Sequence, residues 1–260
     1  MVLAQGGWPD TLLVLWTVVG GSLAAGGANA INMYIDRDID HLMERTRNRP
    51  LVTGRIDPRR ALAFAIMLEV VAFGVLAWSS NVLAASLAIA ATLFYVFVYS
   101  LWLKRTSRQN IVIGGAAGAA PVLVGWASVT NSIAWSPVVL FMIIFLWTPP
   151  HFWALAIRHT DDYRAASVPM LPVVETLPRT VRTMGWYSVA VALVSLVLIP
   201  LNDMGVIYSA AATVLGVAFV AMTFGLGRAP TAAAAMRLFA FSITYVTVLF
   251  SAAMIDVLVR

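Results

Sequence analysis

Long apolar stretches separated by short polar ones dominate this chain. A helix that crosses a bilayer needs roughly 20 apolar residues, and eight stretches are long enough. The predicted spans cover residues 11–35, 61–79, 82–103, 111–130, 137–157, 183–201, 204–226 and 236–257. The pattern predicts an all-α polytopic membrane protein in which residues 1–260 form one helical bundle.

The composition supports this prediction. Hydrophobic residues make up 61% of the chain and charged residues 11%, whereas soluble domains carry about 25% charged residues. The absence of cysteine excludes disulfides, thiolate metal sites and covalent haem attachment through Cys-x-x-Cys-His. Residues 1–10 contain no basic segment, so no cleavable signal peptide is predicted.

Basic residues are confined to one side of the predicted bundle. All Lys and Arg except Arg260 fall in the loops 36–60, 104–108, 158–182 and 227–237. These loops alternate with short, nearly uncharged turns, and the positive-inside rule makes their side cytoplasmic. We therefore expect a multi-pass protein of the inner cell membrane whose loops face the cytoplasm. The net charge of +5 then reflects sidedness and anionic lipid headgroups, and nucleic acid is not an expected partner.

An acid-rich segment ends the first span. Asn32, Asp36 and Asp40 are spaced four residues apart, so they line one face of a continuous helix, while Asp38 points about 200° away from Asp36. Carboxylates this close repel one another unless a cation lies between them. Mg²⁺ accepts such oxygen ligands together with substrate phosphates. We therefore expect Asn32, Asp36 and Asp40 to bind Mg²⁺.

A cluster of basic residues follows, and Arg is suited to phosphate and carboxylate oxygens. Its members are Arg45, Arg47, Arg49, Arg55, Arg59 and Arg60. Taken alone, such an Arg cluster is usually a topology anchor, and such a run of acids is usually a solvated surface. Their combination at one membrane face favours a site for a diphosphate ester with a lipid tail. The residues expected to converge there are Asn32, Asp36, Asp40, Arg45, Arg47, Arg49, Lys104, Arg105, Asp161 and Asp162.

Two further ionisable residues, His151 and Glu69, lie inside predicted spans. His151 precedes Arg158 by seven residues, which is two helical turns, so the two side chains could share a face. An ionisable residue at membrane depth is a functional candidate, although a single His there is more often a packing residue. Glu69 either makes an interhelical hydrogen bond or lines a cavity.

The ordered set of motifs closely resembles the UbiA superfamily of intramembrane prenyltransferases over most of the chain. The motifs are Asn32-Met-Tyr-Ile-Asp36-Arg-Asp-Ile-Asp40, Arg45-Thr-Arg47-Asn-Arg49-Pro50-Leu-Val-Thr-Gly54, Leu103-Lys104-Arg105-Thr106, Asn110-Ile-Val-Ile-Gly114-Gly115, Pro150-His151-Phe-Trp-Ala-Leu-Ala-Ile157, Asp162-Tyr163-Arg-Ala-Ala and Val168-Pro-Met-Leu-Pro172. The resemblance is to the branch of that superfamily that farnesylates haem. It implies a UbiA-type bundle of nine helices around a central cavity, of which eight are visible here.

The resemblance also implies residue roles. Asn32, Asp36 and Asp40 would hold the Mg²⁺-diphosphate of farnesyl diphosphate, and the basic residues would hold diphosphate oxygens or haem propionates. The expected catalytic residues are Asp36, Asp40, Lys104 and His151. The expected substrate-binding residues are Asn32, Arg45, Arg47, Arg49, Arg105, Arg158, Asp161 and Asp162. Arg158 stands where the superfamily's second Asp-x-x-x-Asp motif begins, and His151 where another acid often occurs, which weakens the case for a second Mg²⁺.

The reaction implied is transfer of the farnesyl group to the vinyl group of haem b with addition of water, giving haem O and diphosphate. Haem b is then a substrate, His151 orients the water, accepts its proton or ligates the iron, and aromatic side chains shield the allylic cation. The aromatic residues expected in that role are Phe94, Tyr95, Phe97, Tyr99, Trp147, Phe152 and Trp153. Other implied partners are the lipid bilayer and a downstream haem-modifying or oxidase-assembly protein.

Three other functions stay open. A transporter or channel would carry ionisable groups along its spans at several depths, and here they gather at one face. A haem-binding membrane protein would need paired axial ligands, which three His make difficult. A related prenyltransferase acting on a quinone precursor or a chlorin would keep the same chemistry. Residues 1–9 resemble the end of the family's first helix, so we expect that helix to be missing and the chain as given to be less active than an extended form.

Overall fold

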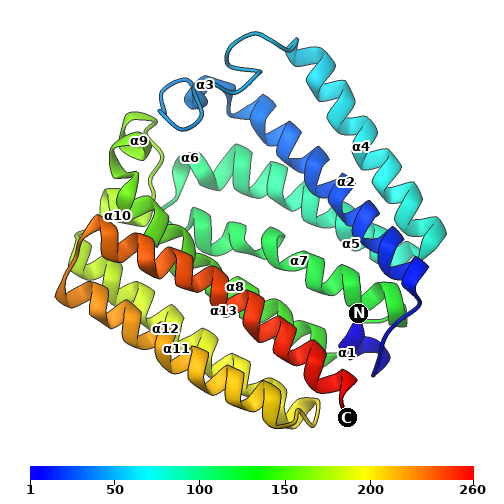
Figure 1. The fold of residues 1–260 in the computed structure, drawn as a ribbon. Helices are drawn as coiled ribbons and strands as arrows, with labels where there is room; N and C mark the ends of the chain where they lie inside the picture. The colour runs from blue at the N-terminus through cyan, green and yellow to red at the C-terminus, as the bar shows by residue number, and fades with distance from the viewer.

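The computed structural model describes residues 1–260, and its elements are all helical (Figure 1). Eight helices are long and apolar enough to cross a membrane, so the chain is a multi-pass membrane protein. The spans are α2 (Thr11–Ile35), α4 (Pro58–Ser79), α5 (Val82–Leu93) continued by η1 (Phe94–Leu103) and α6 (Lys104–Thr106), α7 (Asn110–Thr130), α8 (Trp135–Arg158), α11 (Leu177–Leu201), α12 (Val206–Arg228) and α13 (Ala232–Leu258). The short helices are α1 (Val2–Gln5), α3 (Arg37–Asp40), α9 (Thr160–Ala165) and α10 (Leu171–Val174).

Helices that follow one another in the sequence pack side by side, and α8 also packs against α11 and α13. In Figure 1, α2, α4 and α5 form one side of the bundle and α11, α12 and α13 the other, with α7 and α8 between them. The loops after α2, η1 and α8 all reach one end of the bundle. We call this the motif end, because it carries residues 36–60, 104–108 and 158–182.

Side chains define where several spans begin. The Asp57 carboxylate accepts hydrogen bonds from the backbone N–H groups of Arg59 and Arg60 at 3.0 Å, and Pro58 takes the first helical position of α4. Pro is favoured there because the first N–H of a helix has no partner in any case. Asn81 caps α5 and Thr231 caps α13 in the same way. The caps of α4 and α13 place these helix starts before the predicted spans at 61–79 and 236–257, whereas α5 starts where predicted, at Val82.

Small residues allow close approach between helices. A Cβ atom on Gly20 would lie 2.6 Å from Leu76 Cγ, and one on Gly27 would lie 2.6 Å from Glu69 Oε1. Glu69 accepts a hydrogen bond from Thr92 at 3.2 Å, which confirms the interhelical role and joins α4 to α5. Buried hydroxyl pairs, such as Ser195 with Tyr245 at 2.8 Å, connect helices elsewhere, as is common in membrane bundles.

Asp256, which the sequence reasoning did not single out, is buried near the end of α13. Its carboxylate accepts hydrogen bonds from the backbone N–H groups of Gly205 at 2.6 Å and Tyr208 at 3.2 Å. It also pairs with Arg260 at 3.2 Å. The first N–H groups of a helix lack intrahelical acceptors, so Asp256 caps α12 from a neighbouring helix.

Candidate active site

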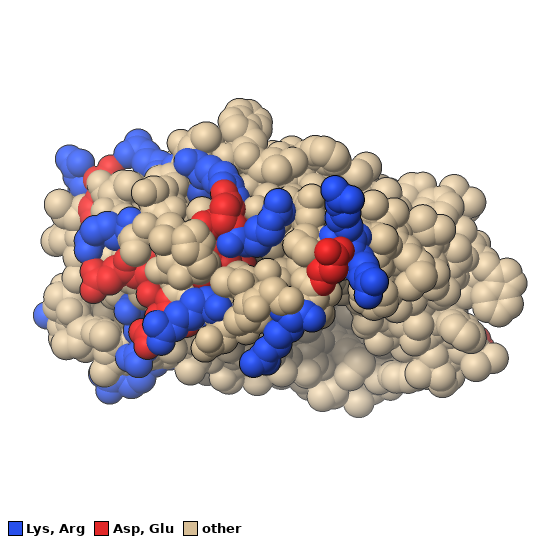
Figure 2. Space-filling view, turned by 90° about the horizontal axis from the view of Figure 1, so that it is seen from above, with Lys and Arg blue, Asp and Glu red and all other residues tan.

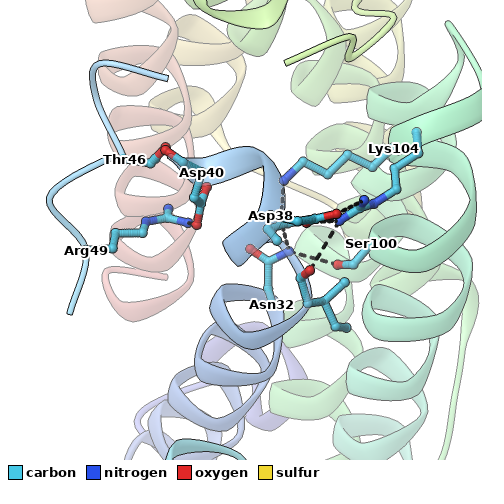
Figure 3. A network of polar contacts seen from close by, with 10 residues as sticks. Asn32, Asp38, Asp40, Thr46, Arg49, Ser100 and Lys104 are labelled. Carbon is cyan, nitrogen blue, oxygen red and sulfur yellow. Dashed lines mark hydrogen bonds and ion pairs between the residues drawn. The ribbon is translucent and has the colours of Figure 1, made fainter. Parts of the chain in front are cut away.

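The acids at the end of α2 are buried and paired with bases at the motif end (Figure 3). Asp36 is 0% exposed and Asp40 is 1% exposed. Lys104 donates to Asp36 Oδ2, and Arg105 lies 3.5 Å from Asp36 Oδ1. Arg49 pairs with Asp40 at 2.5 Å. A buried charge is tolerated only when it is paired. Here Asp36 pairs with Lys104 and Arg105, and Asp40 pairs with Arg49.

The Asn32 side chain is part of the same network. Its amide donates to Asp36 Oδ2 at 2.7 Å and to the Ser100 hydroxyl at 3.0 Å. Ser100 is fully buried on η1, four residues before Lys104. The two residues of each pair, Asn32–Ser100 and Asp36–Lys104, are 68 residues apart in the sequence. Residues four positions apart on α2 therefore contact residues four positions apart at the end of η1. Ser100 was not among the predicted site residues, because this offset becomes visible only once Lys104 is seen to pair with Asp36.

The segment η1 is a π-helix of ten residues. The backbone N–H of Lys104 donates to the carbonyl of Tyr99, five residues earlier. Such wide turns are rare and are frequently found at functional sites. They set where Ser100, Lys104 and Arg105 meet α2, a placement that an ordinary helical periodicity does not predict.

Asp38 was expected to point away from Asp36 on a continuous helix, but the structure joins the two through Arg105. The helix α2 ends at Ile35, and a new turn, α3, begins at Arg37. Arg105 binds both oxygens of Asp38, at 2.6 and 2.7 Å. This hydrogen-bonded pair holds the pKa of Asp38 below its usual range. The break after α2 is the reason that the expected geometry fails here.

The second loop contacts the first beside Asp162. The backbone N–H of Glu44 donates to Asp162 at 3.3 Å, and His159 lies 3.8 Å from the same carboxyl group. Burial raises the pKa of the neighbouring Tyr163, while the nearby Arg45 guanidinium lowers it. Tyr163 was not among the predicted site residues, although it follows Asp162 directly.

Other predicted site residues lie outside this network. Asp161 has a 97% exposed side chain and pairs with Arg164 at 2.7 Å, within one turn of α9. Arg47 and Arg158 are exposed and form no ion pair. They contribute positive charge to the motif end, where basic and acidic side chains intermingle across one part of the surface (Figure 2).

His151 is buried away from the acids, between α8 and α13. Its Nδ1 lies 2.6 Å from the Ser242 hydroxyl. The ring is stacked between Trp147, at 4.2 Å, and Phe239, at 4.5 Å. The structure therefore separates His151 from the acid network and gives it an aromatic environment.

An apolar cavity of about 870 Å³ lies below the acids. Asn29 and Tyr95 line it nearest the motif end, and Trp126 and Phe250 lie at its far end. Asn29 precedes Asp36 by seven residues, or about 10 Å along a helix. The walls are mostly small residues of α2, α5 and α7, including Gly21, Ala28, Ala91, Ala117 and Gly118.

The cavity walls differ from those expected. Of the seven aromatic residues predicted there, only Tyr95 lines the cavity. Phe97 is 59% exposed on the outer surface, and Trp153 is buried against Tyr187 with ring centres 5.6 Å apart. Hydrophobicity alone does not separate residues that face a cavity from those that face lipid or another helix.

The buried carboxylates retain free capacity for a cation. Asp36 Oδ1 and Asp40 Oδ1 are buried and have no hydrogen-bond partner. No three His, Asp or Glu side chains gather closely enough to hold a metal by themselves. Mg²⁺ usually binds through one or two carboxylates plus substrate phosphates and water, so this donor set fits Mg²⁺ when a diphosphate supplies further oxygens.

The bundle, the apolar cavity and the buried acid–base network define an intramembrane enzyme of the prenyltransferase class. The chain belongs to the UbiA prenyltransferase family, whose sequence profile matches residues 1–246. Protoheme IX farnesyltransferase of Clavibacter sepedonicus is 52% identical over 259 residues, which cover 98% of this chain and 85% of the relative. The protein of the same name from Gloeobacter violaceus is 54% identical over 257 residues, covering 98% and 84%.

Solved structures share the fold. A digeranylgeranylglyceryl phosphate synthase superposes with a TM-score of 0.82 at 17% identity, covering 100% of this chain and 90% of that protein. A UbiA homologue from Archaeoglobus fulgidus, bound to DMAPP and Mg²⁺, gives a TM-score of 0.68 at 17% identity, covering 96% and 91%. These similarities confirm the predicted UbiA-type bundle.

Proposed function

We propose that this protein transfers the farnesyl group of farnesyl diphosphate to a vinyl group of haem b, with addition of water, to give haem O and diphosphate. The observation that carries the proposal is that one buried carboxylate oxygen each of Asp36 and Asp40 accepts no hydrogen bond, above an apolar cavity. The relatives named protoheme IX farnesyltransferase, about half identical over nearly the whole chain, support haem b as the acceptor.

Asn32, Asp36 and Asp40 would hold Mg²⁺, which neutralises the charge of a diphosphate leaving group when bound. The Archaeoglobus fulgidus homologue that binds Mg²⁺ with DMAPP supports this assignment. The residues of this chain provide a matching set of positive charges. Lys104, Arg105 and Arg49 neutralise the acids in the structure, and they can move to phosphate oxygens when a cation reaches the acids.

Electrostatic stabilisation of the leaving group is the main work of these residues. As the bond between C1 of the farnesyl group and the diphosphate oxygen breaks, Lys104 and the Arg side chains stabilise the developing negative charge. The apolar cavity holds the isoprenoid chain and keeps bulk water away from the allylic cation. Tyr95, at the motif end of the cavity, presents an aromatic face to that cation.

The second half of the reaction adds the acceptor and water. The vinyl carbon of haem b attacks C1 of the farnesyl cation, which leaves a positive charge on the carbon next to the porphyrin ring. Water adds to that carbon and loses a proton, so one hydroxyl group appears on the product. Arg45, Arg47 and Arg158 are exposed at the motif end without ion pairs, and we assign them to the haem propionates.

We place the protein in the inner cell membrane with the motif end facing the cytoplasm, where both substrates can reach it. The excess of Arg and Lys at that end supports this orientation.

The test supplies the purified protein with farnesyl diphosphate, Mg²⁺ and one acceptor at a time: haem b, a quinone precursor or a chlorin. Mass spectrometry of the acceptor is the measurement. We expect haem b to gain the mass of one farnesyl group plus one water, with the other acceptors unchanged. Farnesylation of a quinone precursor or chlorin in place of haem b would contradict the proposed acceptor and leave the prenyltransferase assignment intact.

A further inference from the structure

His151 and Ser242 form a contact that fixes where the imidazole carries its proton. The Ser242 hydroxyl lies 2.6 Å from His151 Nδ1 and 2.6 Å from the backbone carbonyl oxygen of Phe239. A hydroxyl group has one proton to donate, and a carbonyl oxygen can only accept. Ser242 therefore donates to the Phe239 carbonyl and accepts from His151, so Nδ1 carries the proton and Nε2 keeps a lone pair.

The surroundings of His151 cover both faces of the ring and leave Nε2 without a hydrogen bond. Trp147 and Phe239 cover the two faces of the ring, at interplanar angles of 20° and 21°. The Trp147 indole N–H donates to the Ser242 carbonyl at 2.7 Å, which holds α8 against α13 and fixes this stack. Nε2 makes no hydrogen bond within the protein, and its lone pair lies in the ring plane, away from the two stacked rings. Phe152 meets the imidazole edge-on, with ring centres 5.0 Å apart.

The same surroundings favour a neutral imidazole. The structure pairs His151 with a hydroxyl group and no carboxylate, whereas His residues that take up protons in catalysis are commonly supported by an acid. An imidazolium among aromatic rings would be an uncompensated buried charge. A neutral ring with Nδ1–H anchored and Nε2 free is the arrangement in which His binds a metal, because the second ring nitrogen sets the tautomer and the orientation.

We propose that Ser242 is a positioning residue, which holds His151 in the Nδ1–H tautomer so that Nε2 ligates the iron of haem b. This proposal rests on haem b being the acceptor, as argued under the proposed function. The iron–Nε2 bond would fix the porphyrin relative to the farnesyl cation. No covalent step at His151 is required, and the iron keeps its oxidation state.

The tautomer can be measured without any ligand. The chain has three His, so the variant His41→Gln/His159→Gln retains His151 alone. We expect ¹⁵N chemical shifts of labelled His in this variant to show a protonated Nδ1 and an unprotonated Nε2. Ser242→Ala in the same background should give a mixture of tautomers, and Ser242→Thr, which keeps the hydroxyl, should restore the single form. A protonated Nε2 in the parent variant would overturn the proposal.

Ligation is measured from the absorption spectrum of haem b bound to the protein. His151→Ala should lose the imidazole-ligated spectrum, and added imidazole should restore it. Ser242→Ala should weaken haem binding roughly 10-fold or more, as outer-sphere changes do at metal sites, while the affinity for farnesyl diphosphate stays the same. Ser195→Ala is the matched control, because Ser195 is also fully buried and also bonds a residue of α13.

The two measurements separate the possible failures. Equal effects of Ser195→Ala and Ser242→Ala on the haem spectrum, or a wild-type spectrum in His151→Ala, would overturn iron ligation while haem O synthesis could still proceed. A protein with the expected tautomer that binds no haem would contradict the proposed acceptor, and with it the ligation.

Discussion

Lys104 and Asp36 form an ion pair that joins the end of η1 to the end of α2. Lys104 is the only lysine in the chain, and Asp36 is fully buried. Asn32 donates to the same carboxylate oxygen that Lys104 binds. The other oxygen of Asp36 has no hydrogen-bond partner. Asn32 and Lys104 thus engage one oxygen of Asp36, whereas the other has only the Arg105 guanidinium at 3.5 Å and can accept a cation.

The pair predicts a double-mutant result. Asp36→Asn and Lys104→Met should each lower kcat about 10²–10³-fold, the usual effect of removing one preorganised electrostatic contact. The double variant should lose little more than either single variant, because both side chains act on the same bound diphosphate. Steady-state rates of the four proteins provide the measurement, and losses that multiply would contradict the shared role.

Replacing Asp38 should have a much smaller effect than replacing Asp36, even though Asp38 binds Arg105. Exposed ion pairs contribute about 0–1 kcal/mol, so Asp38→Asn should change the affinity for farnesyl diphosphate less than about fivefold. Arg105→Ala is the stronger variant for comparison, because it removes a contact to Asp36 as well. If titration calorimetry showed Asp38→Asn to be as damaging as Asp36→Asn, the assignment of roles in this segment would be wrong.

The Asp38–Arg105 pair also predicts a dependence on pH. The pair lowers the pKa of Asp38, and unfolded Asp titrates near about 3.9. Its contribution to stability is therefore present above that value and lost as the pH falls through the lower folded-state pKa. The difference in Tm between wild type and Asp38→Asn should be constant from pH 7 to about 5 and should close below about pH 4. A difference that closes between pH 6 and 7 would have another origin.

Gly114 and Gly118 lie one turn apart on α7, but only one of them should be sensitive to substitution by Ala. A Cβ atom on Gly114 would collide with the ring of Tyr99, while nothing lies within 4 Å of the corresponding point on Gly118. Gly114→Ala should destabilise the protein by about 1–3 kcal/mol, the usual cost of overpacking, and lower its Tm in detergent. Gly118→Ala should leave the Tm nearly unchanged, and equal Tm values for the two variants would contradict this packing.

The cavity predicts selectivity for the length of the isoprenoid. Ala91 lines the cavity, so Ala91→Leu should weaken binding of farnesyl diphosphate more than binding of dimethylallyl diphosphate, whose chain is shorter. The control is Ala63→Leu, at an exposed position of α4, which should change neither affinity. Equal weakening of both diphosphates by Ala91→Leu would show that the cavity does not hold the distal part of the chain.

Most of the fold could be predicted from hydrophobic pattern alone, and the spans differ from prediction mainly at their starts. The span expected at 183–201 begins at Leu177, and the one expected at 61–79 begins at Pro58. Both early turns contain Arg, which hydropathy assigns to loops. Because backbone hydrogen bonds and caps determine helix starts, these turns are helical despite their polarity.

The sequence led us to expect part of the acid–base network at the motif end and only part of its geometry. Spacing identified Asn32, Asp36 and Asp40, but the pairing of Asp40 with Arg49 and of Asp36 with Lys104 depends on contacts between distant segments. The break after Ile35 and the π-helix at η1 follow no simple periodicity. Tertiary contacts of this kind also explain why Asp161, although it lies beside Asp162, remains outside the network.

In the function that we propose, buried acids at the motif end bind Mg²⁺ and diphosphate for farnesyl transfer to haem b. The most direct measurement is the mass of haem recovered after the purified protein is incubated with farnesyl diphosphate, with and without Mg²⁺. We predict conversion of haem b to a product heavier by one farnesyl group and one water for the wild type with Mg²⁺. We predict none without Mg²⁺ or with Asp36→Asn. Conversion by Asp36→Asn equal to that of the wild type, or conversion that continues after EDTA has removed Mg²⁺, would contradict the proposed role of the acids.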